Sequence, residues 1–315
     1  MSPGAALSSP VFRFYVLVVA TLLVIAGLSL ATLRWGFRKN VEHAWRSYRG
    51  WLIMVPLLFG VLALGRVATV IFFTILALSA FKEFARATGL YKDWSMSLAV
   101  SLAIVAVGIV ALVRDPRQGL PGWYGLFMAL PVYAIAVILV IPILRNRVRG
   151  QLQAMALAVV GFIYFGWMFG HLAFLANARF AYAYLLFILL AVEINDVAAF
   201  TFGRLFGRHA LRSNISPGKT WEGAVGALLV SMGLPWLLRF TFPHFTAWDC
   251  LLTGLTVGVG GQLGDLAVST IKRDIGIKDM GAAIPGHGGI LDRVDSLIYV
   301  APLFFHIMRW HHGLY

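Results

Sequence analysis

Ten long apolar runs constrain the fold of this 315-residue chain more than any other feature of its sequence. A helix of about 20 apolar residues is long enough to cross the hydrocarbon core of a bilayer. Hydrophobic residues make up 60% of the chain and charged residues only 12%, whereas a soluble domain carries roughly 25% charged residues. The sequence therefore predicts an all-α polytopic integral membrane protein with about ten membrane helices and no soluble domain. The runs cover approximately residues 14–33, 51–64, 67–81, 96–113, 123–144, 155–176, 180–203, 221–238, 250–268 and 296–310.

The second and third runs are short, and they leave two interpretations open. Residues 51–64 and 67–81 either cross the membrane separately or form a re-entrant hairpin around Gly65 and Arg66. In both cases the chain returns to the side that it left. The orientation of the later spans is therefore the same in both interpretations.

The distribution of basic residues predicts this orientation. Of the 26 Lys and Arg residues, 19 lie in the segments that follow the odd-numbered runs, and 7 lie on the opposite side. Cytoplasmic loops of membrane proteins are enriched in Lys and Arg. We therefore expect the odd-numbered segments to face the cytoplasm and both termini to lie outside. The same rule explains the net charge of +13 without a nucleic-acid partner.

The acidic residues gather in the last third of the chain, where nine of the 13 follow residue 192. An ionisable side chain within a membrane span costs several kcal/mol and marks a candidate functional site. The alternative is a carboxylate that pairs with an arginine at the membrane interface. Given the orientation above, five carboxylates converge just below the cytoplasmic surface, and carboxylate oxygens suit a hard cation such as Mg²⁺. They belong to Glu193, Asp196, Asp265, Asp292 and Asp295.

Two polar segments, 203–223 and 269–295, border this acidic layer. Both combine Gly, Lys or Arg and Ser or Thr, the residue types that bind phosphate. Lys219 follows a glycine, as in a nucleotide-binding P-loop, but Ser213 stands where that motif needs a second glycine. We therefore expect Ser216 and the proline after it to begin the eighth span instead. The cations available for phosphate are Lys219, Lys272, Arg273 and Arg293.

His287 is the only histidine in the second polar segment, 269–295, and it lies between glycines. The glycines allow the backbone to approach a ligand closely, so a substrate-binding role and a structural role are equally favoured. The chain has neither an HExxH nor a GxSxG motif. Zinc-dependent hydrolysis and serine-triad chemistry therefore lack the residues that they need.

The second polar segment resembles a known signature. Its stretches Ser269-Thr270-Ile271-Lys272-Arg273, Lys278-Asp279-Met280-Gly281 and Ile284-Pro285-Gly286-His287-Gly288-Gly289-Ile290-Leu291-Asp292-Arg293-Val294-Asp295 are similar to the signature of phosphatidate cytidylyltransferases, also called CDP-diglyceride synthetases. Upstream stretches are similar to further segments of that family: Asn195-Asp196, Gly203-Arg204-Leu205-Phe206-Gly207, 216–223 and Gly264-Asp265-Leu266. Phe200 departs from the family, in which a tyrosine is expected.

The resemblance implies transfer of CMP from CTP to phosphatidic acid, with release of pyrophosphate. It implies that Asp265 and Asp292 hold Mg²⁺, alone or together with K⁺. Lys272 lies seven residues after Asp265 and shares its helix face, so we expect Lys272 to join them in catalysis. The residues expected to bind substrate are Asp196, Ser216, Lys219, Ser269, Arg273, Lys278, His287 and Arg293.

The resemblance covers about residues 190–300. We therefore expect a catalytic membrane domain over 151–315, preceded by N-terminal membrane helices over 1–150 whose role is unassigned. The expected location is a bacterial inner membrane, with membrane lipid around the protein and a homodimer as one option for its assembly.

Three alternatives remain at this point. A transporter or lipid flippase also has acids within its spans, but its polar groups lie at the midplane and recur in inverted repeats. A CTP-dependent lipid kinase would release CDP instead of pyrophosphate. A paralogous cytidylyltransferase would act on another lipid phosphate.

Overall fold

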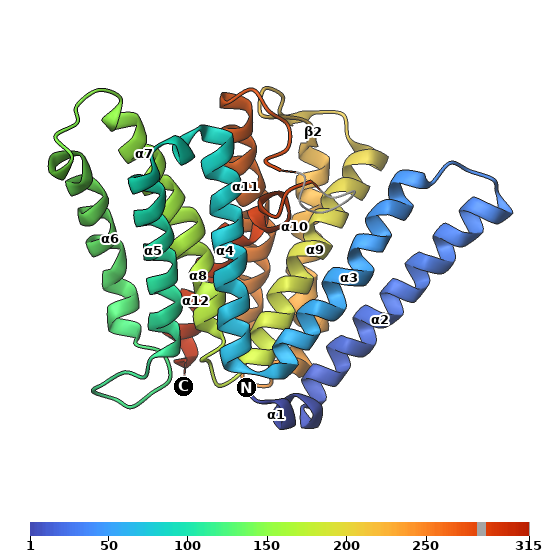
Figure 1. Cartoon of the computed structure of the whole chain (residues 1–315). Helices are drawn as coiled ribbons and strands as arrows, with labels where there is room; N and C mark the ends of the chain where they lie inside the picture. Colours follow the sequence, from blue (N-terminus) through green and yellow to red (C-terminus); the bar gives the residue numbers. More distant parts are fainter. Residues whose placement is uncertain (282–287, 315) are drawn as a thin grey trace.

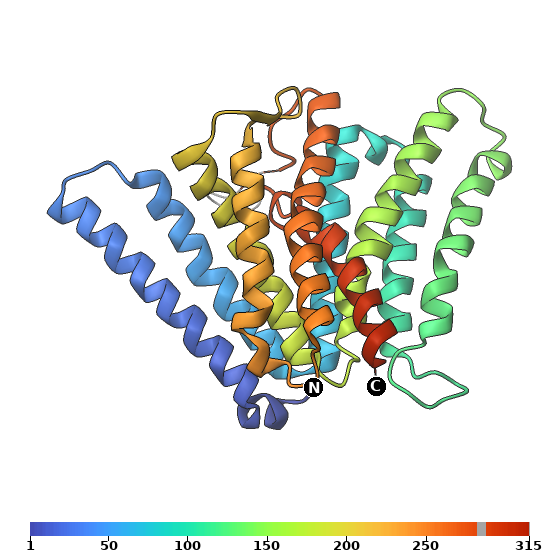
Figure 2. The same cartoon turned by 180° about the vertical axis from the view of Figure 1, so that it is seen from behind.

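The computed structural model describes residues 1–281 and 288–314. Its long helices run roughly alongside one another, and the connections between them lie at the two ends of the bundle (Figures 1 and 2). A short helix, α1 (Pro3–Ser8), precedes this bundle. The others are α2 (Pro10–Ala31), α3 (Glu42–Leu64), α4 (Arg66–Thr88), α5 (Trp94–Leu112), α6 (Tyr124–Leu144), α7 (Gln151–Gly161), α8 (Phe169–Leu175), α9 (Ala181–Phe206), α10 (Trp221–Leu237), α11 (Ala247–Asp274) and α12 (Leu291–His312).

Each predicted apolar run corresponds to one helix or to one continuous helical stretch. The sixth run comprises α7 and α8, which are joined by a π-helical segment, Phe162–Met168. Within the described residues, eight helical stretches are long and apolar enough to cross a membrane. Helices α10 and α12 are not among these eight. The all-α membrane fold is therefore confirmed, while a count of ten crossings stays a prediction.

The second and third runs form two full-length helices. α3 and α4 contain 23 residues each and are joined by a single residue, Gly65. Gly65 has φ of 102°, a conformation that costs glycine little and other residues much more. Both helices meet the length and apolarity needed to cross a membrane, which favours separate crossings over a re-entrant hairpin.

The polar connections lie at one end of the bundle and the two termini lie at the other (Figure 1). The connections at the first end are those from α2 to α3, from α4 to α5, from α6 to α7, from α9 to α10 and from α11 to α12. These are the segments in which basic residues are concentrated. An even number of helical stretches places both termini at the same end of the bundle, as the structure shows (Figure 1). The grouping of the loops therefore agrees with the even number of apolar runs in the sequence.

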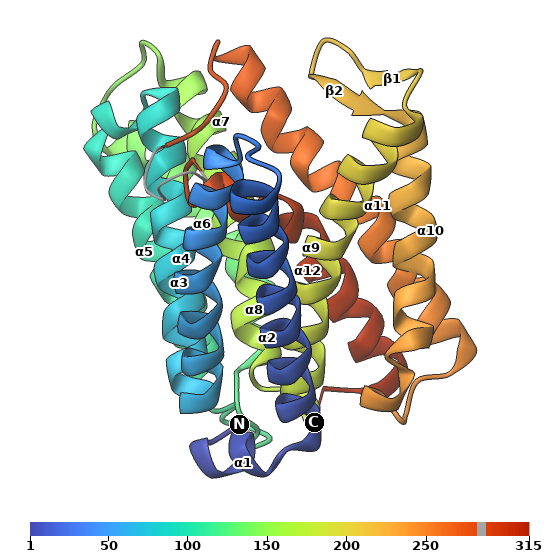
Figure 3. The same cartoon turned by 90° about the vertical axis from the view of Figure 1, so that its right-hand side faces the viewer.

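A small hairpin replaces the helix start that was predicted at Ser216. Strand β1 (Ala210–Arg212) pairs antiparallel with β2 (Ser216–Thr220) above the adjacent helix ends (Figure 3). α10 begins at Trp221, and the Thr220 hydroxyl accepts a hydrogen bond from the backbone N–H of Gly223 at 3.1 Å. The prediction was wrong because Thr220 caps the helix, as threonine commonly does at this position, and leaves Ser216 in the strand.

Candidate active site

Carboxylates from three helices meet at the end of the bundle where the polar connections lie. Asp196 comes from α9, Asp265 from α11 and Asp295 from α12, and all three interact electrostatically with one another. Ser296 donates a hydrogen bond from its hydroxyl to Asp196 at 3.3 Å. This places three of the five predicted acids in one cluster. Glu193, one turn before Asp196, also interacts with it electrostatically.

Close packing of α11 against α12 brings two of these acids together. A Cβ atom on Gly264 would lie only 2.5 Å from the backbone oxygen of Asp295. Real Cβ atoms essentially never approach a heavy atom that closely, so the position requires glycine for the observed packing. Because Asp265 follows Gly264 directly, its carboxylate is held next to the first turn of α12.

Lys219 and Ser269 hold the carboxylate of Asp265. The Lys219 ammonium, from strand β2, lies 2.5 Å from one oxygen of Asp265. It also donates to the side-chain oxygen of Gln262 at 3.3 Å. The Ser269 hydroxyl, one turn further along α11, donates to the other Asp265 oxygen at 3.0 Å. The β hairpin therefore supplies a cation to the acidic cluster.

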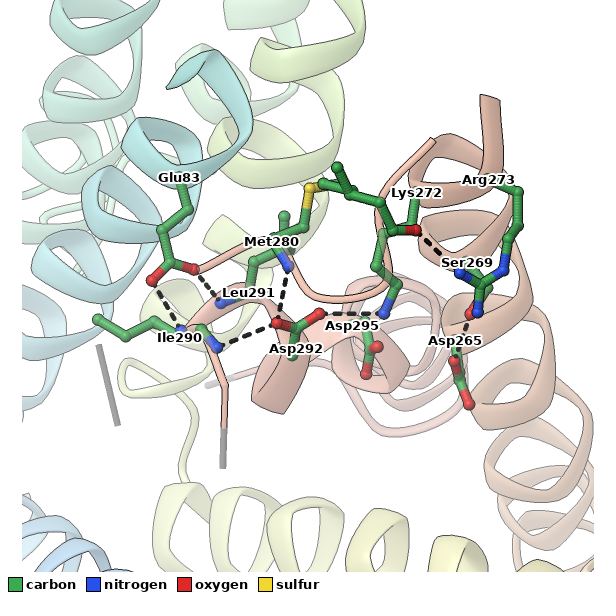
Figure 4. A network of polar contacts seen from close by, with 12 residues as sticks. Glu83, Asp265, Ser269, Lys272, Arg273, Met280, Ile290, Leu291, Asp292 and Asp295 are labelled. Atoms are coloured by element: carbon green, nitrogen blue, oxygen red, sulfur yellow. Dashed lines mark hydrogen bonds and ion pairs between the residues drawn. The ribbon is translucent and has the colours of Figure 1, made fainter. Parts of the chain in front are cut away.

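Asp292 is the centre of a second group, in which it joins α11 to the start of α12 (Figure 4). The ammonium of Lys272 lies 3.0 Å from one oxygen of Asp292, and these side chains are only 10% and 6% exposed. The other oxygen accepts backbone N–H groups of Met280 and Gly289, each at 3.0 Å. The ion pair is thus buried and fixed by the loop that precedes α12.

The acids outnumber the cations in this region. Among the described residues, the five carboxylates of Glu193, Asp196, Asp265, Asp292 and Asp295 are accompanied by three cations, those of Lys219, Lys272 and Arg293. Carboxylates that are withdrawn from water and near one another repel strongly unless a cation compensates them. The excess negative charge and the oxygen donors therefore suit a hard divalent cation, which would in turn bind phosphate groups.

Glu83 is a site residue that the sequence did not reveal. It lies on α4, and its two carboxylate oxygens accept the backbone N–H groups of Ile290 and Leu291 at 3.0 and 2.9 Å (Figure 4). These N–H groups begin α12, where helix donors lack partners within the helix and a negative charge is favourable. The only signal in the sequence was an acidic residue at the end of a span, 207 residues away from its partner.

We expect Glu83→Ala to lower catalytic activity by at least about 10-fold while the protein still inserts and folds. The substitution leaves two backbone donors without their acceptor and loosens the start of α12, and small displacements of reacting groups are costly. Glu83→Gln, which keeps one acceptor oxygen, should retain more activity. The exposed Glu42 supplies the matched control, Glu42→Ala. Equal activity of Glu83→Ala and Glu42→Ala in lipid micelles would contradict this role.

The remaining predicted substrate-binding residues have other surroundings. Arg273 is exposed, and its guanidinium donates to the backbone oxygens of Ile215 and Ile277 at 3.1 and 2.8 Å. It therefore links the end of α11 to the hairpin. Ser216 begins β2, and Lys278 is exposed in the loop after α11. His287 lies outside the described residues.

Arg293 lines a cavity beside the acidic layer. The cavity has a volume of about 630 Å³ and is bordered mainly by apolar side chains of α3, α4, α9 and α12. Its charged lining residues are Arg46, Arg49, Glu193 and Arg293. Ile290, which Glu83 binds, also lines it. The cavity thus combines arginine side chains with an apolar body, the two properties that an anionic lipid requires.

Comparison with known proteins identifies relatives along most of the chain. A family model described as "Cytidylyltransferase family" matches residues 46–311. The phosphatidate cytidylyltransferase of Staphylococcus aureus (strain COL) is 34% identical over 255 residues, which cover 80% of this chain and 94% of the relative. That of Staphylococcus haemolyticus (strain JCSC1435) is 32% identical over 253 residues, covering 80% and 92%. The uncharacterized protein YnbB of Escherichia coli (strain K12) is 30% identical over 298 residues, covering 92% and 95%. The family model thus matches from residue 46 onwards, whereas the resemblance seen in the sequence began at about residue 190. The longer match includes Glu83.

Proposed function

This chain belongs to the cytidylyltransferase family, and we propose that it transfers CMP from CTP to phosphatidic acid, giving CDP-diacylglycerol and pyrophosphate. One structural observation supports the binding of both CTP and phosphatidic acid. A layer of carboxylates and lysines lies beside a cavity that carries arginines and is otherwise mainly apolar. The layer suits a triphosphate with its cation, and the cavity suits a lipid phosphate with its acyl chains.

The reaction places modest chemical demands on the protein. An oxygen of the lipid phosphate attacks the α-phosphorus of CTP, a new P–O bond forms, and the P–O bond to pyrophosphate breaks. Because the lipid phosphate is already an anion at neutral pH, no general base is required. The chain must instead position two anionic substrates and neutralise their charge.

We assign the triphosphate to Lys219 and Lys272, and the lipid phosphate to Arg293. The two lysines supply ammonium groups within the acidic layer, and Arg293 lines the cavity together with Arg46 and Arg49. Arginine binds phosphate through two parallel hydrogen bonds, whereas lysine acts as a compact charge. The arginines on α3 give the first 150 residues a role in binding the lipid, while 151–315 carry the reacting groups.

We propose that Asp265 and Asp292 hold Mg²⁺, alone or together with K⁺. An ionised carboxylate offers about four lone-pair positions. Asp265 uses them for Ser269 and Lys219, and Asp292 for Lys272 and two backbone N–H groups. Both therefore keep acceptor capacity for a hard cation. The bound cation would neutralise charge that develops on the leaving pyrophosphate.

For the orientation, we propose that the polar end of the bundle faces the cytoplasm of a bacterial inner membrane. The enrichment of Lys and Arg at this end supports the proposal. Reporter fusions after residues 150 and 215 should then give a cytoplasmic signal, and a fusion at the C-terminus should give an external one. An external signal at 215 with a cytoplasmic one at the C-terminus would overturn this orientation.

The activity is tested with the detergent-purified full-length chain, CTP, phosphatidic acid and Mg²⁺. We expect CDP-diacylglycerol and pyrophosphate to appear in equal amounts, and neither to appear when either substrate is omitted. Turnover with a different lipid phosphate but not with phosphatidic acid would indicate the paralogous activity. Absence of any nucleotide-dependent turnover, with the protein folded, would contradict the proposal.

A further inference from the structure

A second group of metal-ligating side chains lies at the opposite end of the bundle from the acidic layer. Asp249 is in the first turn of α11, and His311 and His312 are in the last turn of α12. These two helix ends lie at the same end of the bundle as the chain termini (Figures 1 and 2). One ligand atom from each of the three residues lies within 4.8 Å of the other two.

The carboxylate of Asp249 is completely buried, and within the described part of the chain its two ion-pair partners are both histidines. Nδ1 of His311 lies 2.6 Å from one oxygen, and Nε2 of His312 lies 3.0 Å from the other. A buried carboxylate needs a compensating positive charge. A metal ion shared by the three side chains would provide it.

The contact between His312 and Asp249 is close but is not a hydrogen bond. Nε2 of His312 is buried and has no hydrogen-bond partner among the described residues, although it lies within ion-pair distance of the carboxylate. The nitrogen and the carboxylate oxygen therefore lie close together in a geometry that does not suit a hydrogen bond between them. This arrangement is expected where both atoms face a common cation.

Neighbouring residues hold the two sides of this group in place. The backbone N–H and the hydroxyl of Thr246 both donate to Asp249 at 2.7 Å, as part of a capping box. The ring of Phe245 stacks on His312 with an interplanar angle of 5°. Such outer contacts orient the ligands of metal sites. By contrast, the side chain of His311 is 33% exposed, so water can reach the group.

We propose that Asp249, His311 and His312 bind a divalent transition-metal ion of the Zn²⁺ class. Two imidazole nitrogens and one carboxylate oxygen are a common three-residue set for Zn²⁺, whose fourth position is then occupied by water. Imidazole nitrogen is a poor ligand for Mg²⁺, which prefers oxygen. The site therefore selects a different metal from the acidic layer, and it joins the start of α11 to the end of α12.

The test requires full-length protein purified in detergent through a tag that contains no histidine, and then treated with a chelator. Titration with Zn²⁺ should show about one bound ion per chain and a higher unfolding temperature. Co²⁺ should give the visible absorption of a four-coordinate site. Excess Mg²⁺ should not displace either ion.

Four variants separate this site from other sources of metal binding. His311→Ala and His312→Ala should each weaken Zn²⁺ binding by at least about 10-fold and remove the shift in unfolding temperature. His306→Ala, which changes another histidine of α12 that contacts His171 instead, should respond as the unmodified chain does. Absence of stoichiometric Zn²⁺ binding to the unmodified chain, or equal binding by the His311→Ala, His312→Ala double variant, would overturn the proposal. The readouts do not depend on catalytic activity.

Discussion

Replacing Asp265 with alanine is expected to lower the rate of CMP transfer by at least about 10²-fold, because it removes both a proposed metal ligand and the partner of Lys219. Asp265 is at the centre of the acidic cluster, where it meets Lys219 at 2.5 Å and Ser269 at 3.0 Å. Its carboxylate is set by the close contact between α11 and α12 at Gly264. Steady-state kinetics in mixed micelles, with CTP and Mg²⁺ varied separately, measure the effect.

Two further variants distinguish lost chemistry from lost folding. Asp265→Asn keeps the size of the side chain and an acceptor for Ser269, so it should fold normally and still lose most of its activity. Asp274→Ala removes an exposed carboxylate from the end of the same helix and should behave as the unmodified protein. If Asp265→Ala retained full activity with Mg²⁺, the metal assignment would be wrong.

Lys272→Ala is expected to reduce CTP turnover by at least about 10²-fold, and Arg273→Ala by less than about 10-fold. The two cations are adjacent in sequence but differ in their surroundings. Lys272 is 8% exposed and pairs with Asp292 inside the acidic layer. Arg273 is exposed and donates to two backbone oxygens. Arg273→Ala should therefore affect mainly the link between α11 and the hairpin.

The loss of Lys272 also leaves Asp292 as a buried carboxylate without its ion pair, which typically costs about 3–5 kcal/mol of stability. A double variant, Lys272→Ala with Asp292→Asn, removes both charges. If the ion pair only stabilises the fold, this double variant should recover thermal stability and activity together. We expect it to recover stability while turnover stays low. Because the double variant also lacks the Asp292 carboxylate, recovery of turnover would show that Lys272 has only a structural role and would contradict the metal role of Asp292 as well.

The helices were predictable from the sequence because their signal is local. Runs of apolar residues give each helix its position, and the alternation of basic loops gives their grouping at the two ends. The meeting of Asp196, Asp265 and Asp295 was also accessible, since each lies at a similar depth in its own span. Helix ends were less predictable, as Thr220 shows, because a cap depends on which of several polar residues bonds to the first turn.

The contacts that complete the site depend on packing between distant segments, and the sequence gives no direct indication of them. Glu83 reaches the start of α12 across 207 positions. Arg273 binds a backbone oxygen of Ile215, which any residue at that position would present. The pairing of Asp249 with His311 likewise joins residues 62 positions apart. Backbone partners and long-range pairs leave no periodic pattern in the sequence.

The position of the radioactive label in the product tests the proposed reaction most directly. Full-length protein is incubated with phosphatidic acid, Mg²⁺ and CTP labelled at either the α- or the γ-phosphorus, and the lipid fraction is counted. Transfer of CMP predicts label in the lipid from α-labelled CTP and none from γ-labelled CTP. In Asp265→Ala the rate of labelling from α-labelled CTP should fall by at least about 10²-fold. Label in the lipid from γ-labelled CTP would show a lipid kinase and would contradict the proposed function.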